Sequence, residues 1–249
     1  MKLYRLMSGL LIFTVACSAD VDHDDSWGYE GDIGPDNWGQ LSDDWVECSE
    51  GQEQSPIDLD DALTAEDVND YDFVNPGTTV AIHNNGHTIQ YDIDAGSTVT
   101  IGGTEYELLQ FHFHARSEHT VAGAGYPLEV HLVHIDAGGN LAVLGVLIEE
   151  GPENELLAGA MWDQIPVEDL GTVLEEGTTF DPYELIPGGT VWTYDGSLTT
   201  PPCSEGVAWN VFSTPITMSS AQIDAYTAIY SNNYRPVQPL NGRNVLFGE

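Results

Sequence analysis

A succession of short extended segments, closed by turn signals, restricts the fold of this chain more than any other feature. Six stretches between residues 78 and 148 are rich in β-branched and aromatic side chains, which favour strands. They cover residues 78–82, 88–93, 97–101, 107–114, 128–135 and 141–148. The sequences NNGH (84–87) and DAGGN (136–140) are typical of turns between strands. The pattern predicts a large, mostly antiparallel and twisted central β-sheet.

Helical patterns are few and short by comparison. One covers residues 153–165 after Pro152, and another covers residues 220–232 with Ser219 or Ser220 as its N-cap. No fixed-period repeat and no long Pro/Gly/Ser-rich linker divides the chain. We therefore expect a mainly β (α+β) protein with short peripheral helices and a single domain at residues 27–249.

The first residues have the pattern of a secretory signal peptide. Lys2 and Arg5 supply positive charge, and residues 6–16 form an apolar run that is too short to span a bilayer. We interpret residues 1–19 as the signal peptide and residues 20–26 as an acidic spacer. This interpretation predicts an exported protein of the periplasm or the cell surface.

The same segment also allows lipidation. Residues 14–17 (TVAC) resemble a bacterial lipoprotein cleavage box, although Thr14 replaces the usual Leu. Cleavage there would leave residues 1–16 as the signal, and Cys17 as the lipidated first residue of an outer-membrane lipoprotein. Ordinary cleavage near Ala19 is the alternative, and it would discard Cys17. Such a lipid anchor is the only membrane contact that we expect.

The charge balance excludes whole classes of partner. The chain carries 41 acidic and 5 basic residues, for a net charge of −36. Beyond the leader the basic residues are Arg116, Arg235 and Arg243. Such a surface repels nucleic acids and anionic lipid headgroups, so neither is expected as a partner. The composition leaves open whether the acidity is an adaptation to a saline setting or only makes an exported protein very soluble.

Two cysteines remain once Cys17 is set aside. In an exported protein, Cys48 and Cys203 suggest one disulfide. It would close a loop of about 155 residues, which a chain-entropy model values at roughly 5 kcal/mol before any native strain is subtracted. No CxxC motif is present, so we do not expect a zinc site with cysteine ligands.

The sequence FHFH places two imidazoles together. Residues two apart on a strand share a face, so His112 and His114 project to the same side. Phe111, Phe113 and Leu109 are expected to pack on the other side.

A third imidazole lies in the sequence EVHLVH. His131 and His134 are three apart and face opposite ways on a strand, so only one of them can join the first pair. Glu129 shares the face of His131 and can receive its second ring N–H. Three neutral imidazoles suit Zn²⁺ and leave a fourth position for water, although other divalent metals accept the same ligands. The alternative is that these are ordinary core or surface histidines of a sheet. That alternative explains any single histidine more readily than the whole set.

Six motifs in order resemble the α-class carbonic anhydrases. They are QSPIDL (54–59), NNGH (84–87), QFHFHARSEHT (110–120), LEVHLVH (128–134), SLTTPPCSE (197–205) and YRPVQPLNGR (234–243). With WGY (27–29) they span almost the whole chain after the leader. The resemblance implies a zinc enzyme that hydrates carbon dioxide reversibly to bicarbonate and a proton, by attack of zinc-bound hydroxide.

The resemblance also implies roles for individual residues. Zinc would be held by His112, His114 and His131. Gln110 would be the hydrogen-bond partner of His112, and Glu129 that of His131. Thr199 would face the hydroxide, and Glu118 would lie behind Thr199. His87 would be the proton shuttle. Its water path would be bordered by Tyr29, Asn85, Gln90 and Thr200. Carbon dioxide would lie among Val133, Val143, Leu198, Val207 and Trp209, with Thr200 also at the substrate.

Several alternatives accompany this resemblance. A catalytically silent binding module on the same fold would lack part of the zinc-binding and catalytic set, whereas all three histidines, Thr199 and Glu118 are present. Zinc esterase activity is expected only as a side reaction. His119 and His134 are expected to be structural. The sequence is compatible with a monomer or a homodimer.

Overall fold

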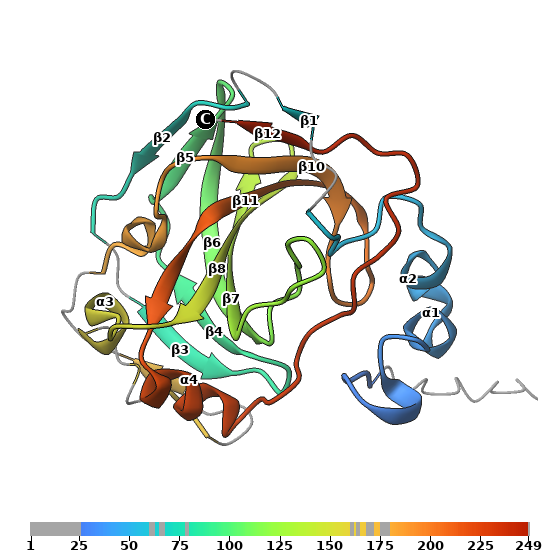
Figure 1. Cartoon of the computed structure of the whole chain (residues 1–249), viewed down its shortest axis with the longest axis horizontal. Helices are drawn as coiled ribbons and strands as arrows, with labels where there is room; N and C mark the ends of the chain where they lie inside the picture. The colour runs from blue at the N-terminus through green and yellow to red at the C-terminus, as the bar shows by residue number, and fades with distance from the viewer. Residues whose placement is uncertain are drawn as a thin grey trace, which may run out of the picture.

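The described residues of the computed structural model form one large mixed sheet. They are residues 26–59, 63–64, 68–77, 80–159, 162, 165–167, 172–174 and 180–248. Within them the sheet has 12 strands in the main order β1-β12-β10-β11-β8-β7-β6-β4-β3-β9, and β5 pairs with both β2 and β6 (Figure 1). The pairs β8–β11 and β1–β12 are parallel, and the other pairs are antiparallel. The expected fold class, a mainly β domain with short helices, is confirmed.

The bounds of the elements are as follows. The strands are β1 (Leu63–Thr64), β2 (Tyr71–Val74), β3 (Val80–Asn84), β4 (Ile89–Ile93), β5 (Thr98–Ile101), β6 (Thr104–Ala115), β7 (Leu128–Asp136), β8 (Leu141–Glu150), β9 (Thr172–Leu174), β10 (Val191–Ser197), β11 (Glu205–Met218) and β12 (Leu246–Gly248). The α-helices are α1 (Trp38–Leu41), α2 (Glu47–Glu50), α3 (Glu155–Gly159) and α4 (Ser220–Thr227). Short 3₁₀ turns are Gly31–Ile33, Asp43–Trp45 and Pro182–Leu185.

The six strands expected from the sequence are β3 to β8, with ends displaced by a few residues. The sequence interpretation did not assign β10 and β11, although β11 is the longest strand described. It pairs with β10 on one side and β8 on the other. Only the structure shows that β11 lies in the centre of the sheet, next to β8.

Helix α4 is shorter than expected. It begins after Ser219, whose side chain accepts from the backbone N–H of Gln222 while Gln222 reaches back to Ser219, a capping box. It ends at Thr227 rather than near residue 232. The chain then leaves the helix and brings Asn233 to the sheet, where its amide donates to the carbonyl of Phe113.

Both faces of the central strands are buried. Alternate residues supply two apolar clusters, one including Phe111, Phe113 and Leu132, the other including Val143 and Trp209. Consequently β8 is buried at seven consecutive positions, 142–148, as expected for a strand covered on both sides. Polar side chains on such strands need partners within the protein.

A β-bulge corrects one expectation about β6. Leu109 was expected to pack with Phe111, but it is 41% exposed, whereas Leu108 is 1% exposed. The register with β7 shifts between Leu108 and Gln110. An extra residue in one strand changes which side chains share a face. Leu108 therefore joins the core with Phe111, while Gln110 keeps the face of His112.

The disulfide expected from the cysteine count is present. Cys48 in α2 is bonded to Cys203, in the loop between β10 and β11. Both cysteines are buried and pack with Trp38 in a third, small apolar cluster. The bond links an N-terminal segment to a loop 155 residues further along the chain.

Removal of this bond should cost stability. Replacing Cys48 and Cys203 together by alanine is expected to lower the free energy of unfolding by about 2–5 kcal/mol, because the unfolded chain regains the freedom of a long loop. Denaturant titration followed by tryptophan fluorescence measures the change. Reduction of the native protein should reproduce it, and an unchanged midpoint would contradict this account.

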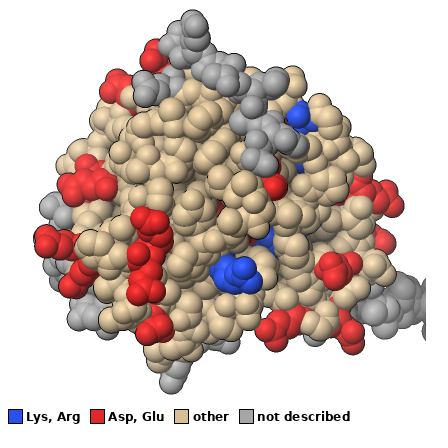
Figure 2. Space-filling model, in the orientation of Figure 1, with Lys and Arg blue, Asp and Glu red and all other residues tan. Residues whose placement is uncertain are grey.

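Residues 1–25 lie outside the described residues, so the signal peptide, the lipidation of Cys17 and nearly all of the spacer stay predictions. None of the helices that the structure describes has the length and apolarity to cross a membrane. Acidic side chains lie along much of the edge of the face shown in Figure 2 and in a strip left of its centre, whereas basic side chains are few. Arg235 does little to offset them, because it is only 1% exposed.

Candidate active site

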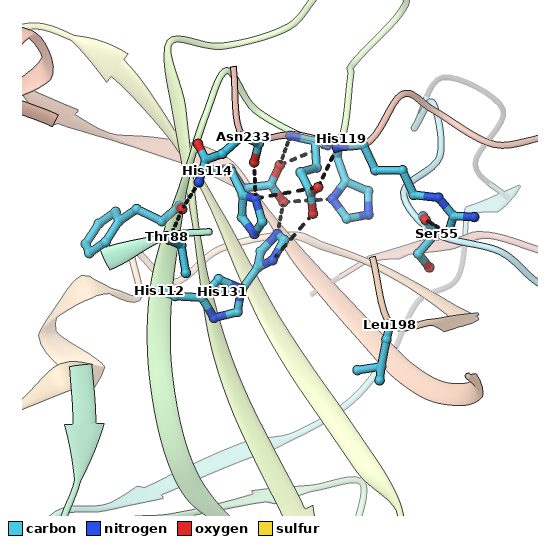
Figure 3. Close-up of polar contacts among 12 residues, drawn as sticks. Ser55, Thr88, His112, His114, His119, His131, Leu198 and Asn233 are labelled. Carbon is cyan, nitrogen blue, oxygen red and sulfur yellow. Dashed lines mark hydrogen bonds and ion pairs between the residues drawn. The ribbon is translucent and has the colours of Figure 1, made fainter. Parts of the chain in front are cut away.

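Three imidazoles meet on neighbouring strands. In the register of β6 and β7, His112 lies directly opposite His131, and His114 follows two residues along β6. Their ring centroids are 4.6–5.4 Å apart. One nitrogen from each ring lies within 4.8 Å of the others. Figure 3 shows the three rings turned toward one another.

Hydrogen bonds select which nitrogen of two rings is available. His112 Nδ1 bonds to Gln110 Oε1 at 2.8 Å, which leaves Nε2. His131 Nε2 bonds to Glu129 Oε1 at 2.8 Å, which leaves Nδ1. The two partners expected from the sequence are therefore in contact with these rings.

The third ring has a partner that the sequence interpretation missed. His114 Nδ1 bonds to the backbone carbonyl of Asn233 at 2.7 Å. Asn233 directly precedes the motif YRPVQPLNGR, and that position is the only signal that pointed to it. His114 Nε2 is buried and has no hydrogen-bond partner among the described residues. A buried polar atom without a hydrogen-bond partner lowers the free energy of unfolding by roughly 1–3 kcal/mol unless a ligand binds to it.

The surroundings keep the three imidazoles neutral. Burial lowers the pKa of His114 to about 4. Burial, and then the neighbouring histidines, hold the pKa of His112 well below its usual value. The pKa of His131 is also lowered by burial, although Glu129 opposes the change. Metal ligation requires neutral imidazole, so the donor set and the unpartnered His114 Nε2 fit a divalent cation such as Zn²⁺.

Glu129 on β7 is bonded to the loop that precedes this strand, between β6 and β7. Oε2 accepts from the backbone N–H groups of Glu118 and His119, at 2.8 and 2.9 Å. Oε1 is bonded to the rings of both His119 and His131. Burial raises the pKa of Glu129, but the interactions with the two histidines outweigh it and bring the pKa well below its usual value. The carboxylate is thus ionised and fixed.

His119 has the structural contacts expected of it. It is fully buried, and its Nε2 bonds to the Tyr194 hydroxyl at 2.7 Å. His134 projects away from the three imidazoles, since its Nδ1 bonds to the carbonyl of Leu132 and its Nε2 to the Tyr183 hydroxyl. The inference that only one histidine of EVHLVH joins the first pair is therefore correct.

Glu118 lies directly behind the imidazoles. Its carboxylate is 3.5 Å from His114 Nδ1 and 3.8 Å from His131 Nδ1. Oε1 accepts from the backbone N–H of Arg235 at 2.8 Å, and Oε2 has no hydrogen bond of normal geometry with any described residue. Burial raises the pKa to about 7; His131, the Thr199 hydroxyl and the Arg235 N–H oppose this. Thr199 therefore lies close to the carboxylate without a well-aligned bond.

A cavity of about 130 Å³ opens beside His112 and His114. Its lining includes all five residues expected at the shuttle and its water path: Tyr29, Asn85, His87, Gln90 and Thr200. The sequence interpretation did not foresee Trp27, which also lines it. The Trp27 ring stacks on His87 with centroids 3.7 Å apart and planes within 5°.

The apolar residues expected around carbon dioxide also lie together. Val143, Val207 and Trp209 are buried in one cluster, and Val133 and Leu198 pack against it. The sheet register explains this, because Val143 lies opposite both Val133 and Trp209. We call these five residues the apolar wall. The Trp209 ring centroid is 4.9 Å from that of His131, so the apolar wall adjoins the three imidazoles.

Comparisons with known proteins agree on one family. The protein-family model described as eukaryotic-type carbonic anhydrase matches residues 33–248. A carbonic anhydrase from Nostoc sp. is 42% identical over 230 residues, covering 89% of this chain and 85% of the relative. One from Klebsiella pneumoniae is 43% identical, covering 88% and 90%. The solved α-carbonic anhydrase from Thermovibrio ammonificans, in complex with the inhibitor sulfanilamide, superimposes with a TM-score of 0.85 at 43% identity, covering 89% and 98%.

Proposed function

The chain belongs to the eukaryotic-type, or α-class, carbonic anhydrase family and is a carbonate dehydratase, and from this premise we propose that His112, His114 and His131 hold its catalytic Zn²⁺. The observation that carries the proposal is the convergence of three neutral imidazole nitrogens, one of which is buried and has no hydrogen-bond partner in the part of the chain that the structure describes. Two of the rings are oriented by Gln110 and Glu129 and the third by the carbonyl of Asn233. When bound, zinc supplies a Lewis acid that makes hydroxide available near neutral pH, the general property for which carbonic anhydrases are the standard example.

Glu118 and Thr199 would direct the attacking oxygen. Ionised Glu118 can only accept, so the Thr199 hydroxyl must donate to it. The unpartnered Oε2 of Glu118 supports this assignment. The Thr199 oxygen can then only accept a hydrogen bond from the nucleophile, which aims the lone pair of the nucleophile at the substrate carbon. A divalent cation at the three imidazoles would also favour the ionised form of Glu118.

The apolar wall would receive carbon dioxide. This substrate carries no charge and needs no ionic clamp, so Val143, Val207 and Trp209, with Val133 and Leu198, can hold it by shape and dispersion alone. Thr200 lines the cavity beside His112 and would contact the substrate from the polar side.

His87 would carry the released proton to solvent. It shares the cavity with His112 and His114, and an imidazole can take up and release a proton near neutral pH. Tyr29, Asn85 and Gln90 line the same cavity and would border the intervening water.

Replacing His87 by alanine tests this role. Turnover in weak buffer is expected to fall at least about tenfold, because a positioned acid–base group contributes roughly 10²–10⁴-fold and water replaces it only in part. Stopped-flow hydration assays measure the change. The ratio kcat/KM for carbon dioxide should stay the same, and imidazole buffer should restore turnover. Full turnover of the variant in weak buffer would remove His87 from the mechanism.

Export belongs to the same proposal. It depends on residues 1–19, and the Cys48–Cys203 disulfide supports it because such bonds persist in oxidising compartments. The mass of the mature N-terminus would separate a lipidated Cys17 from cleavage near Ala19.

A further inference from the structure

A chain of side-chain hydrogen bonds extends from the cavity along β4 to Asp92. Asn85 Nδ2 donates to Gln90 Oε1 at 3.1 Å, and Gln90 Nε2 donates to Asp92 Oδ1 at 2.6 Å. The other oxygen of Asp92 is 3.2 Å from His83 Nδ1. Asp92 itself is not a cavity residue, whereas Asn85 and Gln90 are.

The sheet register explains why this chain reaches the site. His83 on β3 lies opposite Gln90 on β4, and Gln90 lies opposite His112 on β6. Residues directly opposite each other in antiparallel strands project from the same face. His83, Gln90 and His112 therefore form one row across three strands. Asp92, two residues after Gln90, shares this face.

Both ends of the chain fix the direction of its amides. Asn85 Oδ1 accepts from the backbone N–H groups of His87 and Thr88, at 3.0 and 2.9 Å. These groups can only donate, so the NH₂ of Asn85 must point to Gln90. An ionised Asp92 can only accept, so the NH₂ of Gln90 must point to Asp92. Neither amide can turn over without losing a bond at both of its ends.

We propose that Asp92 is a positioning residue for proton removal, because it fixes the amides of Gln90 and Asn85 that line the shuttle cavity. The inference rests on the proposed function, in which the proton leaves through this cavity. A cavity of about 130 Å³ holds on the order of ten water molecules at most. The orientation of one amide in its wall therefore changes which hydrogen bonds a large share of that water can make.

The test compares three variants of the zinc-loaded enzyme. Asp92→Ala removes the acceptor, whereas Asp92→Asn keeps one oxygen that can accept from Gln90. Asp72→Ala removes the same charge from an exposed position on β2 and is the matched control. We expect Asp92→Ala to lower turnover in weak buffer about 3- to 10-fold, at or below the lower bound of the roughly 10–100-fold losses seen for the hydrogen-bond partners of metal ligands. Its kcat/KM should be unchanged, and the other two variants should resemble the native enzyme.

A second readout does not depend on activity. In ¹⁵N-labelled protein, with or without metal, the side-chain NH₂ signals of Gln90 should move toward the position of a solvent-exposed amide in Asp92→Ala. They should return in Asp92→Asn. Unmoved signals would show that Asp92 does not hold Gln90 and would overturn the inference.

The kinetic outcomes separate this inference from the shuttle role of His87. If His87→Ala slows turnover in weak buffer and Asp92→Ala does not, the shuttle stands and the inference fails. If Asp92→Ala slows turnover and His87→Ala does not, Asp92 controls proton removal and the shuttle role fails. A loss in Asp92→Ala that appears equally in kcat/KM, or equally in Asp72→Ala, overturns the inference, since a general structural or charge effect would then explain it.

Discussion

Replacing His114 by alanine should abolish both metal binding and turnover. The variant removes a proposed ligand whose Nε2 is buried and has no hydrogen-bond partner among the described residues, and the two remaining imidazoles cannot complete a catalytic zinc site. Turnover should fall on the order of 10⁴-fold or more, since enzymes commonly accelerate reactions by 10⁶-fold or more and this one would lose the source of its nucleophile. Elemental analysis should give close to one zinc per native chain and almost none in the variant.

His134→Ala is the matched control for that experiment. His134 is equally buried and lies on the same strand as His131, but it bonds to Leu132 and Tyr183 on the other side of the sheet. This variant is expected to lose stability and to keep its zinc. Circular dichroism verifies that both variants are folded at the assay temperature. Native zinc content in a folded His114→Ala protein would refute the proposed metal site.

Thr199→Ala should give the second largest effect. The hydroxyl is expected to be the only group that links Glu118 to the nucleophile, so its loss removes the direction of attack while the metal ligands stay intact. Loss of one preorganised hydrogen-bonding group typically costs about 10²–10³-fold in rate. We expect kcat/KM for carbon dioxide to fall by roughly that factor, measured by stopped flow, with zinc content unchanged.

Thr199→Ser distinguishes the hydroxyl from the rest of the side chain. Serine keeps the donor and acceptor of threonine and loses only a methyl group, so most of the activity should return. If the serine and alanine variants were equally slow, packing around Thr199 rather than its hydrogen bonds would explain the loss.

Much of the proposed metal site could be predicted from local geometry. Residues two apart on a strand share a face, so the motifs HxH and ExH each predicted two side chains on the same face. The resemblance to a family then predicted that the two pairs belong to one site. The positions of Gln110 and Glu129 beside their histidines obey the same period of two. Leu109 is the exception, because the bulge in β6 is a feature of the pairing with β7 and leaves no signal in the strand itself.

Contacts between distant segments could not be derived in this way. Asn233 reaches His114 only because the chain leaves α4 after Thr227, 113 residues after His114. Trp27 covers His87 because the N-terminal segment returns to the cavity. Such contacts depend on how the whole chain packs, and no local preference of Trp27 or Asn233 encodes them.

The sequence by itself therefore determined the strands β3 to β8, the three imidazoles, the catalytic pair Glu118 and Thr199 as expectations, and the cysteine pair. The tertiary structure decided which ring nitrogen of each histidine is available, the partner of His114 and the chain of amides that ends at Asp92. The physical reason is the range of the interactions: the alternation of a strand acts over two residues, whereas hydrogen bonds across a sheet join residues whose neighbourhood exists only after folding.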